Sequence, residues 1–217
     1  MNDQIIKTFY ENRNDEHAEG MTKYMKYKFP FLGIKRPERS KLQREVIKQY
    51  KKSSEIDWDF INKLWSLPER EFQYFAIDIL IACDSKLKSD DLVKVKNLII
   101  QKSWWDTVDL LASKVTGAIA NSTPEVIANT ILKWSQDDNL WLKRTAILFQ
   151  LKYKENTDKD VLSQVILENC DTDEFFLNKA IGWILREYSK TNRDWVESFI
   201  SRNTLSKLSI REGSKYL

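Results

Sequence analysis

The chain has 217 residues, of which 42% are hydrophobic and 31% charged, with a formal net charge of +3. This composition excludes a disordered chain, and a charge so near neutral neither requires nor excludes a nucleic-acid partner. Because only five glycines and four prolines are present, we expect a nearly all-helical fold. The two cysteines, Cys83 and Cys170, lie far apart in no metal-binding motif, so we interpret them as thiols of a reducing compartment.

The sequence contains no sign of a membrane or secretory segment. No apolar run approaches the ~18 residues that a membrane span needs, and the first residues, MNDQIIKTFYENRND, are too polar for a signal peptide. We therefore expect a soluble protein of the cytoplasm. The single histidine, His17, lies in a charged segment, which excludes Ser-His and Cys-His catalysis and histidine-ligated metals. Any chemistry must come from carboxylates, lysines, arginines or aromatic side chains.

Residues 1–60 predict two or three amphipathic helices around a break at 29–33, where the sequence is FPFLG. Just before this break, tyrosines including Tyr24 alternate with lysines. Cations interleaved with aromatic rings suit a phosphate backbone with a stacking contact. An amphipathic helix whose lysines extend along its apolar face explains the pattern equally well.

From residue 61 to 217 a repeat of about 34 residues is visible. Each repeat predicts two antiparallel helices, and the second helix carries a small residue at a fixed place. These small residues are Ala76, Ala112, Ala146, Ala180 and Gly213. Such pairs stack side by side, so we expect an α-solenoid of HEAT-like repeats in a single domain spanning residues 1–217.

The segment SWWDTVD contains the most informative pair of residues. Ser103 and Asp106 have the spacing of a capping box, which predicts a helix starting at Trp104. On that helix Trp105 and Asp109 are four residues apart and share a face. A π-surface beside a carboxylate suits a cationic ligand. Packing of Trp105 in the core is the alternative.

Alignment of the repeats brings Arg144 into the first turns of the helix next to the one that carries Asp109. Arg144 shares its helix face with leucines and isoleucine, so it needs a partner. That partner is either a carboxylate of the fold or a phosphate from outside. An internal Asp109–Arg144 ion pair would stiffen the array without implying catalysis.

The segment 179–190 predicts a third candidate surface. Trp183, Arg186 and Lys190 share a helix face, and Lys179 lies one turn earlier. Cations around an aromatic ring suit a nucleic-acid backbone. A solvated basic face around a core tryptophan is the alternative interpretation.

Together the segments SWWDTVD, WLKRTAILFQLKYK, EFFLNKAIGWILREYSK, YMKYKFPFLGIKRPER and LPEREFQ resemble the AlkD-like family of DNA alkylation repair glycosylases, over essentially the whole chain. The resemblance implies a superhelix of HEAT-like repeats with a concave DNA-binding face. It assigns catalytic roles to Asp109, Trp105 and Arg144. It assigns DNA contacts to Trp183 and Tyr24, and we add four nearby cations to that set, namely Arg186, Lys190, Lys179 and Lys102.

The resemblance further implies hydrolysis of the N-glycosidic bond of cationic N3- or N7-alkylated purines in double-stranded DNA, such as 3-methyladenine and 7-methylguanine. It implies a monofunctional enzyme of base excision repair that works as a monomer, needs no cofactor or metal, and has no base-binding pocket. Two alternatives remain. One is a catalytically silent relative that binds damaged or branched DNA, and the other is a helical-repeat adaptor that binds a peptide or protein along its groove.

Overall fold

The computed structural model describes residues 2–217, and within them the chain forms helices and turns without any strand. None of the helices in this range combines the length and the apolar character that crossing a membrane requires. Contacts divide the chain into two compact units, the first ending at Leu87 and the second spanning Lys88–Leu217. The all-helical fold expected from the scarcity of glycine and proline is confirmed. The single domain remains a prediction.

The first unit consists of five helices and a short 3-10 turn. They are α1 (Asn2–Glu11), α2 (Asp15–Tyr24), α3 (Arg36–Lys52), α4 (Trp58–Ser66), α5 (Arg70–Ala82) and η1 (Asp84–Lys86). Helix α5 contacts both α3 and α4. Three amphipathic helices precede residue 60, and the break expected at 29–33 lies in the loop between α2 and α3. This part of the sequence-based prediction is confirmed.

The loop that follows α2 is held by a buried carboxylate. Glu71 accepts hydrogen bonds from the backbone N–H groups of Leu32 (3.0 Å), Gly33 (2.8 Å) and Ile34 (3.1 Å). Burial raises the pKa of Glu71, and these hydrogen bonds oppose the rise. Gly33 has φ +84°, and a Cβ there would lie 2.0 Å from the Asn14 carbonyl oxygen, so only glycine fits.

The second unit begins with the turn η2 (Ser89–Asp91) and continues as helical pairs. Its helices are α6 (Leu92–Ile100), α7 (Trp105–Leu110), η3 (Leu111–Thr116), α8 (Gly117–Ser122), η4 (Ile127–Ile131), α9 (Leu132–Ser135), α10 (Leu140–Leu148), η5 (Lys154–Asn156), α11 (Lys159–Leu167), α12 (Phe175–Ser189), α13 (Arg193–Arg202), α14 (Lys207–Gly213) and η6 (Ser214–Tyr216). Segments η3 and η4 are π-helical.

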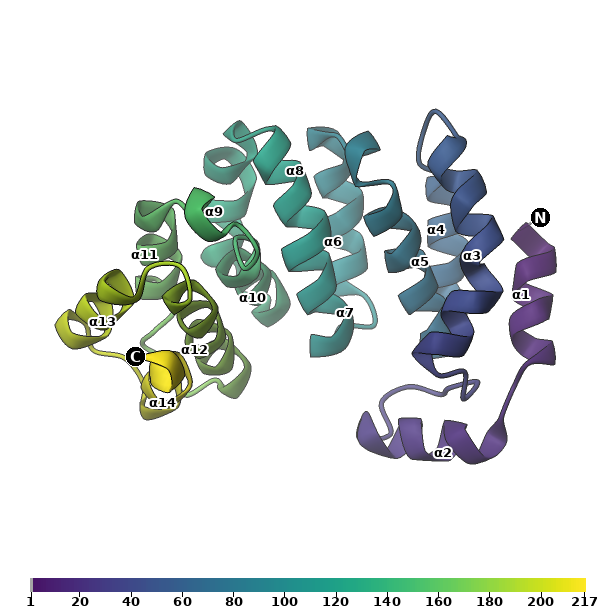
Figure 1. The fold of residues 1–217 in the computed structure, drawn as a ribbon, viewed down its shortest axis with the longest axis horizontal. Coiled ribbons are helices and arrows are strands. Elements are labelled where there is room, and N and C mark those ends of the chain that lie inside the picture. Colours follow the sequence, from purple (N-terminus) through teal and green to yellow (C-terminus); the bar gives the residue numbers. More distant parts are fainter. Residues whose placement is uncertain (1) are drawn as a thin grey trace. The chain divides into compact units, whose positions relative to one another are not determined.

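The second helices of the repeats stack in chain order. The continuous helix α7–η3–α8 contacts α10, α10 contacts α12, and α12 contacts α14 (Figure 1). The small residues at the repeat position lie inside this stack, since Ala112, Ala146 and Ala180 have no exposed surface. Ala112 and Ala180 belong to one apolar cluster that also contains Leu148 and Ile181. The predicted helical-pair repeat is therefore confirmed in this unit.

The predicted start of the helix that carries Asp109 is wrong by one residue. Helix α7 begins at Trp105, and no side chain caps it. The hydroxyl of Ser103 instead donates to the carbonyl oxygen of Ile99, 2.6 Å away in α6. The connection between α6 and α7 is so short that Ser103 completes the end of the preceding helix, whose last carbonyl groups also need donors.

Candidate active site

Asp109 and Arg144 form a buried ion pair between two neighbouring helices. Nε of Arg144 donates to Oδ1 of Asp109 at 2.7 Å, and Nη2 donates to Oδ2 at 2.9 Å. The two residues expose only 8% and 4% of their surface. Each carboxylate oxygen therefore accepts one guanidinium hydrogen bond in the bidentate geometry that fixes a carboxylate most firmly. Of the alternatives for Arg144, the internal carboxylate is the one observed.

Arg144 also fastens a third helix. Its Nη1 donates to the carbonyl oxygen of Phe176, in the first turn of α12, and the Phe176 ring centroid lies 6.0 Å from the guanidinium carbon. A guanidinium has five donors in a rigid plane, so one side chain can hold α7, α10 and α12 together. The orientation of Asp109 is thereby linked to the packing of three successive repeats.

The two tryptophans of the SWWDTVD segment have different surroundings. The ring centroid of Trp104 lies 5.7 Å from Trp141 and 5.0 Å from Phe176, so Trp104 packs between repeats. Trp105 is half-buried and lines a cavity that also reaches Asp109. Both tryptophans are partly exposed, and of the two it is Trp105 that lines the cavity.

This cavity has a volume of about 360 Å³ and collects most of the predicted site residues. It is lined by Trp105, Asp109, Arg144, Phe175, Phe176, Lys179, Trp183 and Arg186. Its walls combine aromatic rings, one carboxylate and three cations. No amide or hydroxyl side chain is among these residues. Such a cavity can hold a cation against the rings and Asp109, and a phosphate against the lysine and arginines.

The electrostatics of Asp109 are set by opposing effects. Burial raises the pKa of its carboxyl group, and the hydrogen bonds and charge of Arg144 oppose the rise without cancelling it. A carboxylate with a raised pKa is a better proton acceptor than an ordinary aspartate. Because little water surrounds it, its charge also acts more strongly on a cation in the cavity.

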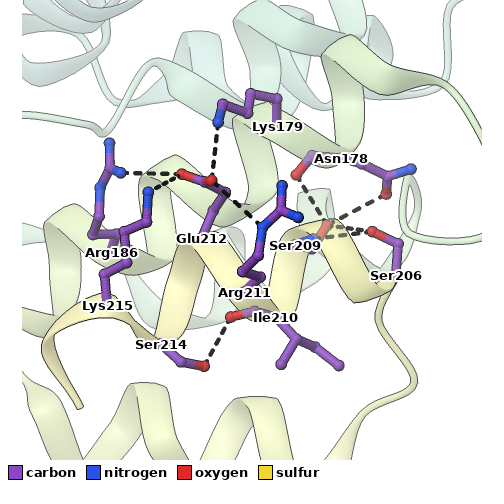
Figure 2. Close-up of polar contacts among 10 residues, drawn as sticks. All are labelled: Asn178, Lys179, Arg186, Ser206, Ser209, Ile210, Arg211, Glu212, Ser214 and Lys215. Atoms are coloured by element: carbon purple, nitrogen blue, oxygen red, sulfur yellow. Dashed lines mark hydrogen bonds and ion pairs between the residues drawn. The ribbon is translucent and has the colours of Figure 1, made fainter.

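Two of the cavity cations are joined to a carboxylate from the last helix. Glu212 in α14 lies 3.0 Å from Nζ of Lys179 and 3.1 Å from Nη1 of Arg186 (Figure 2). The sequence reasoning missed Glu212, because no spacing rule links a lone carboxylate to cations 26 and 33 positions away. It also missed Phe175, which is 56% exposed. The spacing of Phe175, Lys179 and Trp183 along one face of α12 could have revealed that residue.

The remaining predicted residues lie elsewhere. Lys190 is exposed at the end of α12, with Nζ 2.6 Å from Glu187 and 5.3 Å from the Tyr216 ring centroid. Lys102 lies between α6 and α7 with φ +49°. Neither lines the cavity. Tyr24, in the first unit, is 68% exposed and borders a separate hollow of about 380 Å³ with Phe31 and Lys35. The roles of these three residues in DNA binding stay predictions.

The described residues contain no group of three His, Cys, Asp or Glu side chains placed to hold a metal ion. Of the two cysteines, Cys83 is buried, Cys170 is half-buried, and neither forms a disulfide.

Comparison with known proteins identifies the family of this chain. Residues 5–217 match the family of DNA alkylation repair enzymes. A solved structure described as a predicted DNA alkylation repair enzyme from Enterococcus faecalis shares 37% identity with the chain, superposes with a TM-score of 0.88, and aligns over 94% of this chain and 96% of that one. A search of curated proteins gives no match. Because the family match covers nearly the whole chain, the protein belongs to the DNA alkylation repair enzyme family.

Proposed function

We propose that this protein is a DNA glycosylase that hydrolyses the N-glycosidic bond of N3- and N7-alkylated purines in duplex DNA. The observation that carries the proposal is the buried Asp109 carboxylate, fixed by Arg144 and opening beside Trp105 onto an aromatic and cationic cavity. Membership of an alkylation repair family supports a lesion of this kind as substrate.

The chemistry of the lesion suits a buried carboxylate. Alkylation at N3 of adenine or N7 of guanine gives the base a positive charge, so the base leaves as a neutral molecule. The sugar then passes through an oxocarbenium-like cation, as in other glycosidic cleavages. Asp109 would stabilise that cation, because its charge lies in a site of low dielectric constant. Each of its oxygens accepts one bond from Arg144 and keeps a lone pair with which to orient the attacking water.

The aromatic walls would hold the sugar and the lesion. Trp105, Trp183 and Phe175 line the cavity, and a cation against such a ring gains about 0.5–2 kcal/mol. Under this proposal the charged side chains of the lining serve the sugar cation and backbone phosphates, and no amide or hydroxyl side chain remains there to read the edge of a base. We therefore propose that the protein holds the backbone around the lesion and does not enclose the base.

The proposed enzyme is monofunctional. A glycosylase that also cuts the strand needs a neutral amine to attack the sugar. The amine that lines the cavity is Lys179, and its Nζ lies 3.0 Å from the Glu212 carboxylate. An ammonium held in this ion pair has no electron pair for attack. Water is then the nucleophile, and an intact strand with an abasic site is the product.

This product makes the reaction the first step of base excision repair. We propose that the protein carries it out as a monomer in the cytoplasm, on double-stranded DNA and without a cofactor. The proposed activity needs only the cavity of the second unit, the bound duplex and water.

The decisive experiment measures base release from a duplex that contains one N7-methylguanine. We expect release by the wild type and a loss of about a hundredfold or more in Asp109→Asn, since removing a charge-stabilising group commonly costs about 3 kcal/mol. Duplex binding by the variant should be retained. Binding without release by the wild type would instead identify a silent reader of damaged or branched DNA. Normal release by Asp109→Asn would remove Asp109 from the mechanism.

A further inference from the structure

Glu212 is a buried carboxylate surrounded by four cationic side chains. It exposes 5% of its surface. Its oxygens lie 2.8 Å from Nζ of Lys215, 3.0 Å from Nζ of Lys179, 3.1 Å from Nη1 of Arg186 and 3.9 Å from Nε of Arg211 (Figure 2). One negative charge therefore meets four positive ones, and the cluster keeps a formal excess of three positive charges.

The backbone is built to bring Glu212 this close to α12. Gly182 has no side chain, and a Cβ there would lie 2.5 Å from Cβ of Glu212 and 3.0 Å from the carbonyl oxygen of Ser209. Ser209 in turn donates its hydroxyl to the carbonyl oxygen of Asn178 at 2.9 Å. Helix α14 is thus seated directly on α12, and the carboxylate lies among the cations of both helices.

Lys179 and Arg186 connect this cluster to the candidate active site. Both line the cavity that contains Asp109 and Trp183, and both are only partly exposed. Each uses one donor on Glu212. Since an ammonium has three donors and a guanidinium five, each cation can also bind a ligand in the cavity. The ligand that suits two neighbouring cations is a phosphodiester.

From this geometry we infer that Glu212 is a positioning residue, which holds Lys179 and Arg186 in the orientation that binds a backbone phosphate beside the lesion. The inference rests on the proposed function, because it assumes a DNA strand in the cavity. A negative charge at a DNA-binding surface normally weakens binding, whereas here its removal should weaken binding, because two cations lose their orientation.

The test compares Glu212→Gln with Glu187→Gln as a matched control. Glu187 lies on α12 and, like Glu212, bridges cations: it lies 3.0 Å from Lys152 and 2.6 Å from Lys190. It does not line the cavity. Both variants lose one negative charge from the same unit. We expect Glu187→Gln to bind duplex DNA as tightly as the wild type or more tightly. Glu212→Gln should bind about tenfold more weakly than Glu187→Gln and should release base about tenfold more slowly.

Glu212→Asp keeps the negative charge but moves the carboxylate. It therefore tests whether the position of the carboxylate, and not the net charge of the protein, determines duplex binding. We expect it to recover part of both losses, and a thermal melting curve of each variant tests folding. If Glu212→Gln does not fold, Glu212→Asp alone tests the role of Glu212. We expect Glu212→Asp to bind duplex DNA more weakly than the wild type. Binding equal to Glu187→Gln in folded Glu212→Gln, or equal to the wild type in Glu212→Asp, would overturn the inference.

The two proposals fail separately in this design. Binding of an undamaged duplex requires no catalysis, so it tests Glu212 even if the wild type releases no base. Suppose that the wild type releases base and that Glu212→Gln and Glu187→Gln do not differ in duplex binding or base release. This result would support the glycosylase and contradict the positioning role of Glu212.

Discussion

Asp109 and Glu212 are both buried carboxylates of the second unit, and each contacts an arginine from a neighbouring repeat. Asp109 has one cationic side chain within ion-pair distance, whereas Glu212 has four, counting those of its own segment. The pKa values move in opposite directions, because desolvation outweighs the one cationic partner at Asp109, whereas the hydrogen bonds with lysines outweigh desolvation at Glu212. That of Asp109 is raised, with desolvation as the largest cause. That of Glu212 is lowered to about 2 by its hydrogen bonds with Lys215 and Lys179.

The difference shows how one fold produces two kinds of acidic group. A carboxylate with a single partner keeps a charge that a bound cation can feel, and it remains basic enough to handle water. Around a carboxylate with several cationic partners, the positive charges outnumber the one negative charge. The excess positive charge makes the surroundings a site for anions. The number of cations around each carboxylate therefore separates the proposed catalytic centre from the proposed phosphate site.

The largest expected effect follows from removing a single cation from each carboxylate. Arg144→Ala leaves the buried Asp109 without its ion-pair partner, so we expect a loss of about 3–5 kcal/mol in the free energy of unfolding. Lys179→Ala leaves three cations around Glu212 and should cost less than about 1 kcal/mol. Urea unfolding at neutral pH measures both losses. Equal losses would show that the two carboxylates depend equally on a single cationic partner for their contribution to stability.

The second expected effect concerns the pH dependence of base release. Because the pKa of Asp109 lies above the usual 3.8, the carboxylate becomes protonated at a higher pH than an ordinary aspartate. The rate should fall as the pH falls through that raised value. Single-turnover rates, corrected for spontaneous loss of the lesion, would reveal this acid limb. Asp109→Asn should lack it, and the same limb in that variant would assign it to another group.

The third expected effect is a pH-dependent contribution of Glu212 to the free energy of unfolding. Its folded pKa of about 2 lies below the usual 4.5, so ionised Glu212 stabilises the folded state fully above about pH 4.5. This contribution is lost as the pH falls from there toward 2. The unfolding free energies of wild type and Glu212→Gln should differ most above pH 4.5 and converge near pH 2. A difference that stays constant over this range would contradict the ion-pair origin.

The smallest effect is expected at the aromatic wall of the cavity that contains Asp109. Trp183 lines the cavity, while Trp195 packs against Tyr188 and Phe199 away from it. Trp183→Phe should weaken binding of a lesion duplex by up to about 1 kcal/mol, because the smaller ring gives a weaker cation–π contact. Trp195→Phe should leave binding unchanged. Fluorescence anisotropy with a labelled duplex measures both, and equal losses would place Trp183 outside the interface.

Much of this architecture could be predicted from the sequence, because it depends on spacing. The 34-residue interval between Ala112 and Ala146 brings their helices together, and that register predicts the meeting of Asp109 and Arg144. The features that could not be predicted depend on contacts without a period. Ser103 completes α6 instead of capping α7, and Glu212 meets Lys179 across 33 positions. The π-helical turns of η3 immediately after α7 also leave no pattern in the residue types.

The threefold attachment of Arg144 has a consequence for the motion of the second unit. Its guanidinium joins α7, α10 and the start of α12, so a bound phosphate that drew on the same donors would loosen those helix contacts. Amide hydrogen exchange in the first turns of α10 and α12 would then report occupancy of the cavity from a distance. Under the proposed function, the stiffness of these helices and the binding of a phosphate would be coupled through this one side chain.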